Sequence, residues 1–209
     1  MTYYGYNNII LEDRKTMSKI AIIVGSTRQG RQTQKLAQWV ANELDGKADA
    51  EVLDLVDYPM PFLDEAISPR YNPDRKPEPT TKKWLDKVAQ FDGYVMVTPE
   101  YNRSTSAVLK NAIDVLAHEL DDKPVALVAH GVTGGAQAVA SLRIALPGVG
   151  AVTLPQALFF SDRLAESISD DGVLNKEIAE RPFGPQGQLD TQLATLLAYA
   201  DALKVVRSS

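Results

Sequence analysis

The chain has 209 residues and a net charge of −5, with 44% hydrophobic residues, 23% charged residues and no cysteine. This length allows one sizeable domain, and the acidic balance argues against nucleic-acid binding, which usually needs a basic face. No apolar run approaches the roughly 20 residues that a membrane span requires. The lack of cysteine excludes thiol nucleophiles, disulfides and thiolate metal sites.

The first 17 residues do not share the pattern of the rest. The stretch MTYYGYNNIILEDRKT is polar and aromatic without a clear period, whereas Met17-Ser18-Lys19 resembles a natural start. We therefore expect residues 1–17 to be an N-terminal extension without fixed structure, and residues 18–209 to form the domain. The segment also lacks the pattern of a targeting peptide, so a cytoplasmic protein is expected.

Strand-like and helix-like segments alternate after this extension. Residues 20–24 (IAIIV) form a nearly continuous β-branched run followed by glycine, typical of a strand covered on both faces. Apolar residues at four-residue spacing predict a helix over 31–44. Further strands are expected at 50–55, 93–98, 124–130 and 151–155, and further helices at 81–90, 106–120, 135–146 and along the leucine stripe 189–203. Five strands alternating with five helices predict an α/β fold with an open, mostly parallel sheet and helices on both faces.

The segment 56–80 interrupts this alternation. It contains six prolines, which exclude a long helix or a central strand. A loop of this length inside a compact domain is usually functional or covered by a partner.

The loop after the first strand, GSTRQGRQT, has the composition of an anion-binding turn. It lacks the lysine and following hydroxyl of a Walker A loop, and it lacks the middle glycine of the dinucleotide fingerprint. It still offers the hydroxyls of Ser26 and Thr33, the guanidinium of Arg28 and the start of a helix. We expect it to bind a single phosphate; a solvated turn with incidental charges is the alternative.

The loops after the third and fourth strands lie at the same edge of the predicted sheet. In TPEYNRSTS, Tyr101 offers a ring and Asn102 an amide, a pairing that suits a planar heterocycle, while Ser104 belongs to a run that also suits a helix cap. In HGVTGG, three glycines suggest backbone brought close to something flat, although a merely flexible turn is the alternative. His130 ends the fourth strand, where α/β folds place ligands.

Metal chemistry finds no support in the sequence. His118 and His130 are the only histidines, and their spacing is not that of a metal-ligand motif. His118 is expected at the surface, and no metal site is predicted.

Together, the motifs GSTRQGR, DLVDYPMPFLDE, TPEYNRSTSAVLKNAIDVL and HGVTGG resemble the NADPH-dependent FMN reductases, a flavodoxin-like family that includes quinone, azo-dye and chromate reductases. The resemblance covers about residues 18–158, and the PEYN…LKNAID stretch is its most specific part. It implies a flavodoxin-like three-layer α/β/α fold with a five-stranded parallel sheet. The Arg31-Gln32-Thr33 run departs from many relatives, which carry a serine or asparagine late in the first loop.

The resemblance also implies a cofactor site for FMN. The phosphate would bind at the first loop, the isoalloxazine and ribityl chain along the second, and the pyrimidine edge at the backbone of the third. The residues that the resemblance assigns to FMN are Ser26, Arg28, Gln32, Thr33, Pro99, Glu100, Tyr101, Asn102, Ser104, His130, Gly131 and Gly134.

By the same resemblance, the expected activity is hydride transfer from NADPH to bound flavin and on to a quinone, flavin, azo or metal-oxyanion acceptor. The flavin carries this chemistry, so no catalytic side chain is required. Family members commonly pair, and we expect a homodimer or homotetramer that uses the proline-rich loop or the helix 106–120. A flavodoxin-type electron carrier and a non-redox module that binds a phosphorylated ligand are the alternatives.

Overall fold

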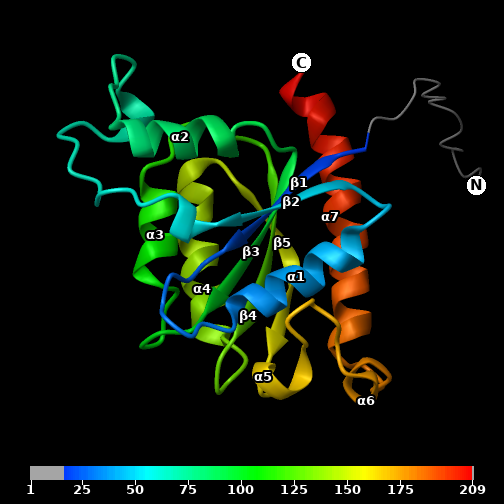
Figure 1. Ribbon diagram of the computed structural model, residues 1–209. Coiled ribbons are helices and arrows are strands. Elements are labelled where there is room, and N and C mark those ends of the chain that lie inside the picture. The colour runs from blue at the N-terminus through cyan, green and yellow to red at the C-terminus, as the bar shows by residue number, and fades with distance from the viewer. Residues whose placement is uncertain (1–16, 209) are drawn as a thin grey trace, which may run out of the picture.

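A computed structural model of the chain describes residues 17–208. The predicted extension therefore lies outside the described residues except for Met17, and both it and the domain boundary at residue 18 stay predictions. The described part is a three-layer α/β/α fold with a five-stranded parallel sheet in the order β2-β1-β3-β4-β5 (Figure 1). The predicted fold class is confirmed.

The three central strands follow from their composition. They are β1 (Lys19–Val24), β3 (Gly93–Pro99) and β4 (Pro124–His130). All of their side chains are buried except those of Lys19 and His130 at the strand ends, as expected for strands covered on both faces. The edge strands are β2 (Asp49–Asp54) and β5 (Val152–Phe160), and they combine buried positions with partly and fully exposed ones.

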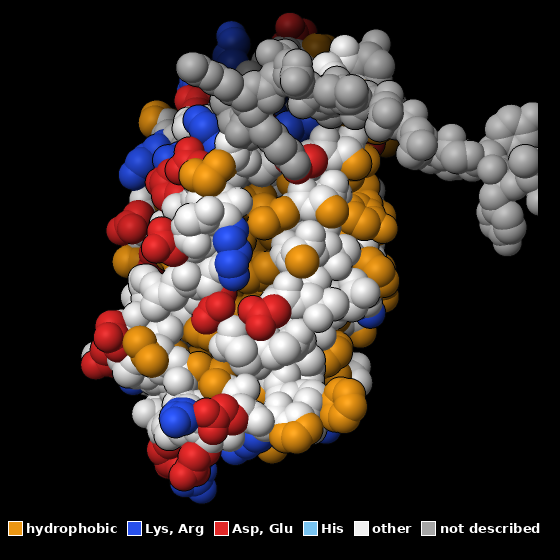
Figure 2. All heavy atoms as spheres, turned by 90° about the vertical axis from the view of Figure 1, so that its right-hand side faces the viewer, with side chains coloured by type: hydrophobic (Ala, Val, Ile, Leu, Met, Phe, Trp, Pro, Cys, Tyr) orange, Lys and Arg blue, Asp and Glu red, His pale blue; other side chains and the backbone are white. Residues whose placement is uncertain are grey.

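Alternate residues of each strand feed two separate cores. On one face, Ile20 and Ile22 of β1 pack with α1 (Thr33–Leu44) and α7 (Pro185–Arg207). On the other face, Ala21 and Ile23 pack with α2 (Pro79–Val88), α3 (Ala107–Asp114) and α4 (Ala136–Ala145). Figure 2 shows the side of the molecule that carries α7, where hydrophobic side chains lie toward the centre and right and charged side chains gather at the left. None of the helices in residues 17–208 combines the length and hydropathy that crossing a membrane requires.

The strand β5 is longer than predicted. The expected end was residue 155, because proline usually terminates a strand, yet β5 continues to Phe160. Pro155 is tolerated because β5 lies at the edge of the sheet, where a missing N–H leaves no partner strand unpaired. The pairing of β4 with β5 shifts register between Val125 and Leu127, and the buried Gln192 amide of α7 donates to the Leu127 and Gln156 carbonyl oxygens at 3.0 and 3.1 Å.

The helix α3 is shorter than predicted and ends at Asp114 instead of near residue 120. Beyond it, side chains rather than helix hydrogen bonds satisfy the backbone: Arg70 donates to the Ala117 carbonyl at 2.6 Å, and the Glu119 carboxylate accepts from the Ala117 N–H at 2.6 Å. Two short helices, α5 (Leu164–Ser167) and α6 (Lys176–Ala179), were not predicted. Three 3-10 turns complete the chain, at Leu55–Asp57, Pro69–Tyr71 and Leu146–Val149.

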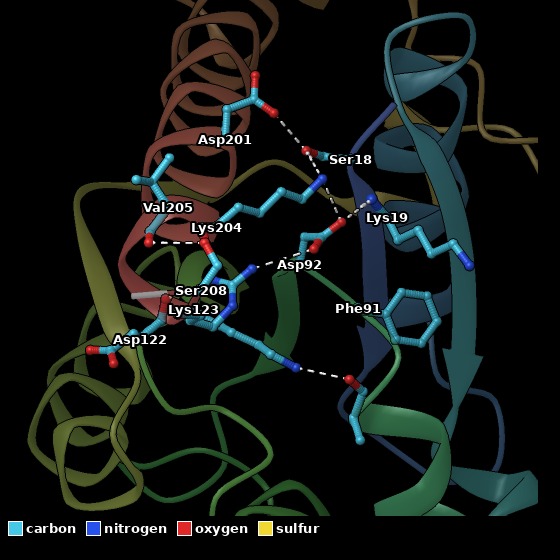
Figure 3. Close-up of polar contacts among 12 residues, drawn as sticks. Ser18, Lys19, Phe91, Asp92, Asp122, Lys123, Asp201, Lys204, Val205 and Ser208 are labelled. Carbon is cyan, nitrogen blue, oxygen red and sulfur yellow. Dashed lines mark hydrogen bonds and ion pairs between the residues drawn. The ribbon is translucent and has the colours of Figure 1, made fainter. Parts of the chain in front are cut away.

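A polar cluster centred on Asp92 fastens the end of α7 to the amino edge of the sheet. The Asp92 carboxylate accepts from the Lys19 N–H at 2.8 Å and pairs with Lys204 at 2.9 Å and Arg207 at 3.3 Å. Figure 3 shows Asp92 lying between Lys19 of β1 and Lys204 of α7. One carboxylate thus joins β1, the start of β3 and the last turns of α7.

We predict that Asp92→Asn lowers the free energy of unfolding by about 1–3 kcal/mol, since hydrogen bonds to charged groups contribute that much when partly buried. Chemical denaturation of the two proteins measures the difference. The matched control is Asp86→Asn, which removes a half-exposed pair with Lys82 within one helix and should cost under about 0.5 kcal/mol. Equal losses in the two variants would show that the cluster contributes no more than a surface pair.

Candidate functional site

The carboxyl ends of the strands surround a hollow of 350 Å³. Its walls come from the loops after β1, β3, β4 and β5, as expected for an open parallel sheet. The lining residues are Arg28, Gly30, Arg31, Gln32, Thr33, Tyr101, His130, Gly131, Val132, Ser161, Asp162, Arg163 and Leu164.

The loop after β1 is held against its neighbours at its start. The Gly25 N–H donates to the Val97 carbonyl at 2.8 Å, and the Ser106 hydroxyl donates to the Gly25 carbonyl at 2.5 Å. A Cβ at Gly25 would lie 2.7 Å from the Val97 oxygen, so only glycine fits. Ser26 is fully buried, and its hydroxyl lies 2.9 Å from the Tyr101 hydroxyl.

The loop leads into the N-terminus of α1, which opens on the hollow. The N-cap residue Gln32 makes no capping bond with its side chain, and the first turn of α1 contains no acidic residue. The backbone N–H groups of such a turn lack intrahelical partners and attract anions. Thr33 at the first position of the helix is buried, and its hydroxyl lies 2.9 Å from Nε2 of His130.

The two arginines of this loop differ in their availability. Arg31 is paired with Asp54 at the end of β2, at 2.7 Å. Arg28 is exposed at the hollow and forms no ion pair with any described residue. Two buried polar atoms here, Nε of Arg31 and Oε1 of Gln32, have no hydrogen-bond partner within residues 17–208.

The loop after β3 forms a tight turn, and only part of it lines the hollow. Tyr101 and Ser104 exchange backbone hydrogen bonds at 2.9 and 3.1 Å. Asn102 and Arg103 between them have φ values of 50° and 69°, as in the two-residue turns that need a positive φ at both central positions. Asn102 therefore lies at an exposed tip, while Tyr101 faces the hollow.

Glu100 organises the next loop. Its N–H donates to the His130 carbonyl at 2.9 Å, and its carboxylate accepts from the Gln137 N–H in the first turn of α4 at 2.9 Å. A carboxylate at a helix N-terminus is favourable because it meets unpaired N–H groups. Gly134 packs under β5, where an added Cβ would come within 2.9 Å of the Phe159 Cβ.

The structure therefore brings half of the predicted cofactor residues to the hollow. Those that line it are Arg28, Gln32, Thr33, Tyr101, His130 and Gly131. Those that do not line it are Ser26, Pro99, Glu100, Asn102, Ser104 and Gly134. Ser26 orients Tyr101, and Ser104 donates to the Ser141 hydroxyl at 3.3 Å, so these two residues fix loops instead.

Sequence reasoning missed the fourth wall of the hollow, Ser161 to Leu164. These residues follow the carboxyl end of β5. The sequence predicts that the strand ends at residue 155, so it does not place the loop after Phe160 at the hollow. The apolar run Ala157-Leu158-Phe159-Phe160 beyond Pro155 is the signal that the strand continues. No group of three or more His, Cys, Asp or Glu side chains in residues 17–208 is placed to hold a metal ion.

His130 is kept neutral by its surroundings. Burial of the ring lowers the pKa of His130 to about 4. At neutral pH the imidazole therefore carries one proton and can donate one hydrogen bond and accept another.

We predict that this histidine makes the protein sensitive to acid. The pKa of His130 is about 4 in the folded state and 6.5 in the reference state. Between these values the unfolded chain binds more protons, so stability falls as the pH is lowered, by at most about 1.4 kcal/mol per pH unit. The free energy of unfolding, measured from pH 7 to 4, should fall less steeply in His130→Gln as the pH is lowered, because the buried imidazole is absent. In His118→Gln, where the changed position is exposed, it should fall as steeply as in the wild type. The same slope in all three proteins would contradict the assignment.

Comparison with known proteins identifies the family. The profile of the NADPH-dependent FMN reductases matches residues 18–165. An NAD(P)H-dependent FMN reductase from Schizosaccharomyces pombe is 35% identical over 189 residues, covering 84% of this chain and 92% of that protein. A quinone reductase from Pseudomonas putida is 29% identical over 174 residues, covering 78% of this chain and 87% of that protein.

The solved structures agree with the fold. FerB from Paracoccus denitrificans, described as a flavoenzyme NAD(P)H:(acceptor) oxidoreductase, superposes with a TM-score of 0.70 at 24% identity. The alignment covers 88% of this chain and 98% of that one. From the matching profile and the curated relatives, we conclude that the chain belongs to the NADPH-dependent FMN reductase family.

Proposed function

We propose that the hollow at the carboxyl edge of the sheet holds FMN, and that the protein uses it to reduce small electron acceptors with NADPH. Membership of the family makes the chain an oxidoreductase that works with FMN and NAD(P)H. It favours a reductase over the two alternatives, an electron carrier and a non-redox module. Relatives named quinone reductase and NADPH azoreductase support quinones and azo compounds as acceptor classes. Free flavin and metal oxyanions are further proposed acceptors. The proposed location of the protein is the cytoplasm.

One observation supports the cofactor most directly: an arginine without an ion pair among residues 17–208 and a helix N-terminus without a side-chain cap line the same hollow. Arg28 and the first turn of α1 offer a guanidinium and free N–H groups to one anion. Nε of Arg31 is a buried donor without a partner within residues 17–208, as expected for an atom that an anion satisfies, whereas Oε1 of Gln32 is a buried acceptor and suits a hydroxyl group of the ligand. The chain also lacks the Walker lysine and hydroxyl, so one phosphate fits this donor set better than a polyphosphate.

We assign the phosphate to Arg28, Gln32 and Thr33, and the ring and ribityl chain to Tyr101, His130 and Gly131. The remaining predicted residues would act by shaping the loops: Ser26, Pro99, Glu100, Asn102, Ser104 and Gly134. FMN held by these residues would supply the chemistry of hydride transfer from NADPH to the acceptor.

The chain's own contribution is position and hydrogen bonding. The bonds Ser26–Tyr101 and Thr33–His130 fix the loops before any ligand arrives, so little reorganisation is needed on binding. His130 presents an uncharged imidazole, which offers a hydrogen bond without placing a further charge in the hollow.

We also propose that two copies associate through the face formed by α3, α4 and the turn Pro69–Tyr71. A hollow of 540 Å³ lies there, with Ile144 and Tyr71 on its surface at 83% and 78% exposure. The proline-rich loop adds Phe62, which is 75% exposed. Exposed apolar side chains grouped in this way mark interaction surfaces. The face therefore suits a homodimer, or one interface of a homotetramer.

We predict that purified protein incubated with FMN and then desalted keeps a visible flavin absorption band, and that NADPH bleaches this band in the absence of air. A reductase should bleach fast and regain its colour when a quinone is added. A colourless protein would overturn the proposal, and a coloured protein that NADPH does not bleach would favour the electron carrier.

The same assay tests the phosphate site. Arg28→Gln should weaken FMN binding by about 10- to 100-fold, because a charge-assisted bond of about 1.5–3 kcal/mol is lost. Arg103→Gln is the matched control, since Arg103 lies on the exposed turn and does not line the hollow. Quenching of FMN fluorescence gives both dissociation constants. Equal affinity in the two variants would remove Arg28 from the site.

For the interface, we predict that Ile144→Glu shifts the protein toward the monomer, because it places a charge in an apolar contact. Light scattering coupled to size exclusion measures the mass over a range of concentrations. The matched variant is Ala198→Glu on the exposed side of α7, which should leave the mass unchanged. If only Ala198→Glu dissociates the protein, the interface lies on α7 instead.

A further inference from the structure

The loop after β5 forms one wall of the hollow and contains an arginine. A ligand with a single phosphate, bound at the start of α1, does not require this arginine. Arg163 lines the hollow with its neighbours Asp162 and Leu164. Its side chain is 84% exposed, so it projects at the rim and not into the core. The residue also precedes α5 and is thereby fixed at the end of the strand.

The charges around Arg163 leave it available. Its guanidinium contacts the Glu166 carboxylate at 3.2 Å, but both groups are mostly exposed, and such pairs contribute little in water. The neighbouring Asp162 is engaged by Arg181 at 2.9 and 3.0 Å. Arg181 therefore neutralises the carboxylate of Asp162, which lies beside Arg163 at the hollow.

The topology separates Arg163 from the phosphate site. Arg28 and the start of α1 follow β1, whereas Arg163 follows β5, and β3 and β4 lie between them. Arg163 and Arg28 therefore border the hollow from different walls, and an arginine that is exposed at the rim suits a second anionic group on a longer ligand.

The reductant supplies such a group. NADPH and NADH differ only in the 2′-phosphate of the adenosine, and a guanidinium fork matches the geometry of a phosphate. Two other arginines, Arg75 and Arg103, are less suitable for this role. Arg75 is bound through its Nε to both carboxylate oxygens of Glu65 at 2.8 Å, and Arg103 lies on the exposed turn outside the hollow.

We propose that Arg163 binds the 2′-phosphate of NADPH and thereby selects NADPH over NADH. The inference rests on the proposed function, since it takes the hollow as the place where reductant meets flavin. Because Arg163 is exposed, solvent screens the contact, and the selectivity that it provides is expected to be about 2- to 5-fold.

The test compares Arg163→Gln with Lys176→Gln in the FMN-loaded protein. Lys176 is an exposed cation on α6 that pairs with Glu180 at 3.7 Å and does not line the hollow, so its loss changes the net charge equally. Steady-state kinetics should give a KM for NADPH that rises about 2- to 5-fold in Arg163→Gln only, with the KM for NADH and both kcat values unchanged.

A binding readout makes the test independent of turnover. By isothermal titration, the wild type should bind 2′,5′-ADP more tightly than 5′-AMP, and Arg163→Gln should lose this difference. Glu166→Gln removes the carboxylate that competes for Arg163, and it should increase the difference between the affinities for 2′,5′-ADP and 5′-AMP. Circular dichroism checks that each variant is folded.

Other outcomes would overturn the proposal. An equal rise in the KM for NADPH and the KM for NADH would show that Arg163 binds a part of the nucleotide that the two reductants share. Weaker FMN binding in Arg163→Gln would assign it to the flavin phosphate. A wild type that retains no FMN would instead contradict the proposed function, and this is seen in the spectrum before any nucleotide is added.

Discussion

Two side-chain hydrogen bonds at the carboxyl edge hold together loops that are far apart in sequence. Ser26 binds Tyr101, and Thr33 binds His130, which links the loop after β1 to those after β3 and β4. All four residues are at least partly buried, so each bond is shielded from competing water. Arg28, Gln32 and Gly131 belong to loops that these bonds hold in place. The hollow is thus a property of the cross-linked loops, and no single loop would form it.

The central part of the fold could be predicted because local sequence and burial agree there. The strands β1, β3 and β4 are continuous apolar runs covered on both faces, so their composition alone indicates them. The edge strand β5 contains Pro155, whose tolerance depends on a position in the sheet that sequence order does not reveal. The end of α3 could not be predicted either, because Arg70, more than 40 residues away, takes the carbonyl of Ala117.

The same limit applies to the site. Motif and composition single out the loops, and Arg28, Thr33 and Tyr101 of these loops line one hollow. They do not reveal that Arg31 is paired with Asp54 of another strand. They also do not reveal that Glu100 accepts from the first turn of α4 and so shapes a neighbouring loop. Long-range pairings of this kind decide which charged side chains are available to a ligand and which belong to the scaffold.

The amino ends and the carboxyl ends of the strands have different roles. The amino edge, with Asp92 joining β1 and α7, carries ionic contacts. At the carboxyl edge, the buried Nε of Arg31 and Oε1 of Gln32 have no hydrogen-bond partner within residues 17–208. The last turn of α7 lies at the amino ends of the strands (Figure 1), whereas the hollow lies at their carboxyl ends. A protein attached to an electrode or bead through its C-terminal turn would therefore point its hollow toward the solution, where nucleotides and acceptors can diffuse in freely.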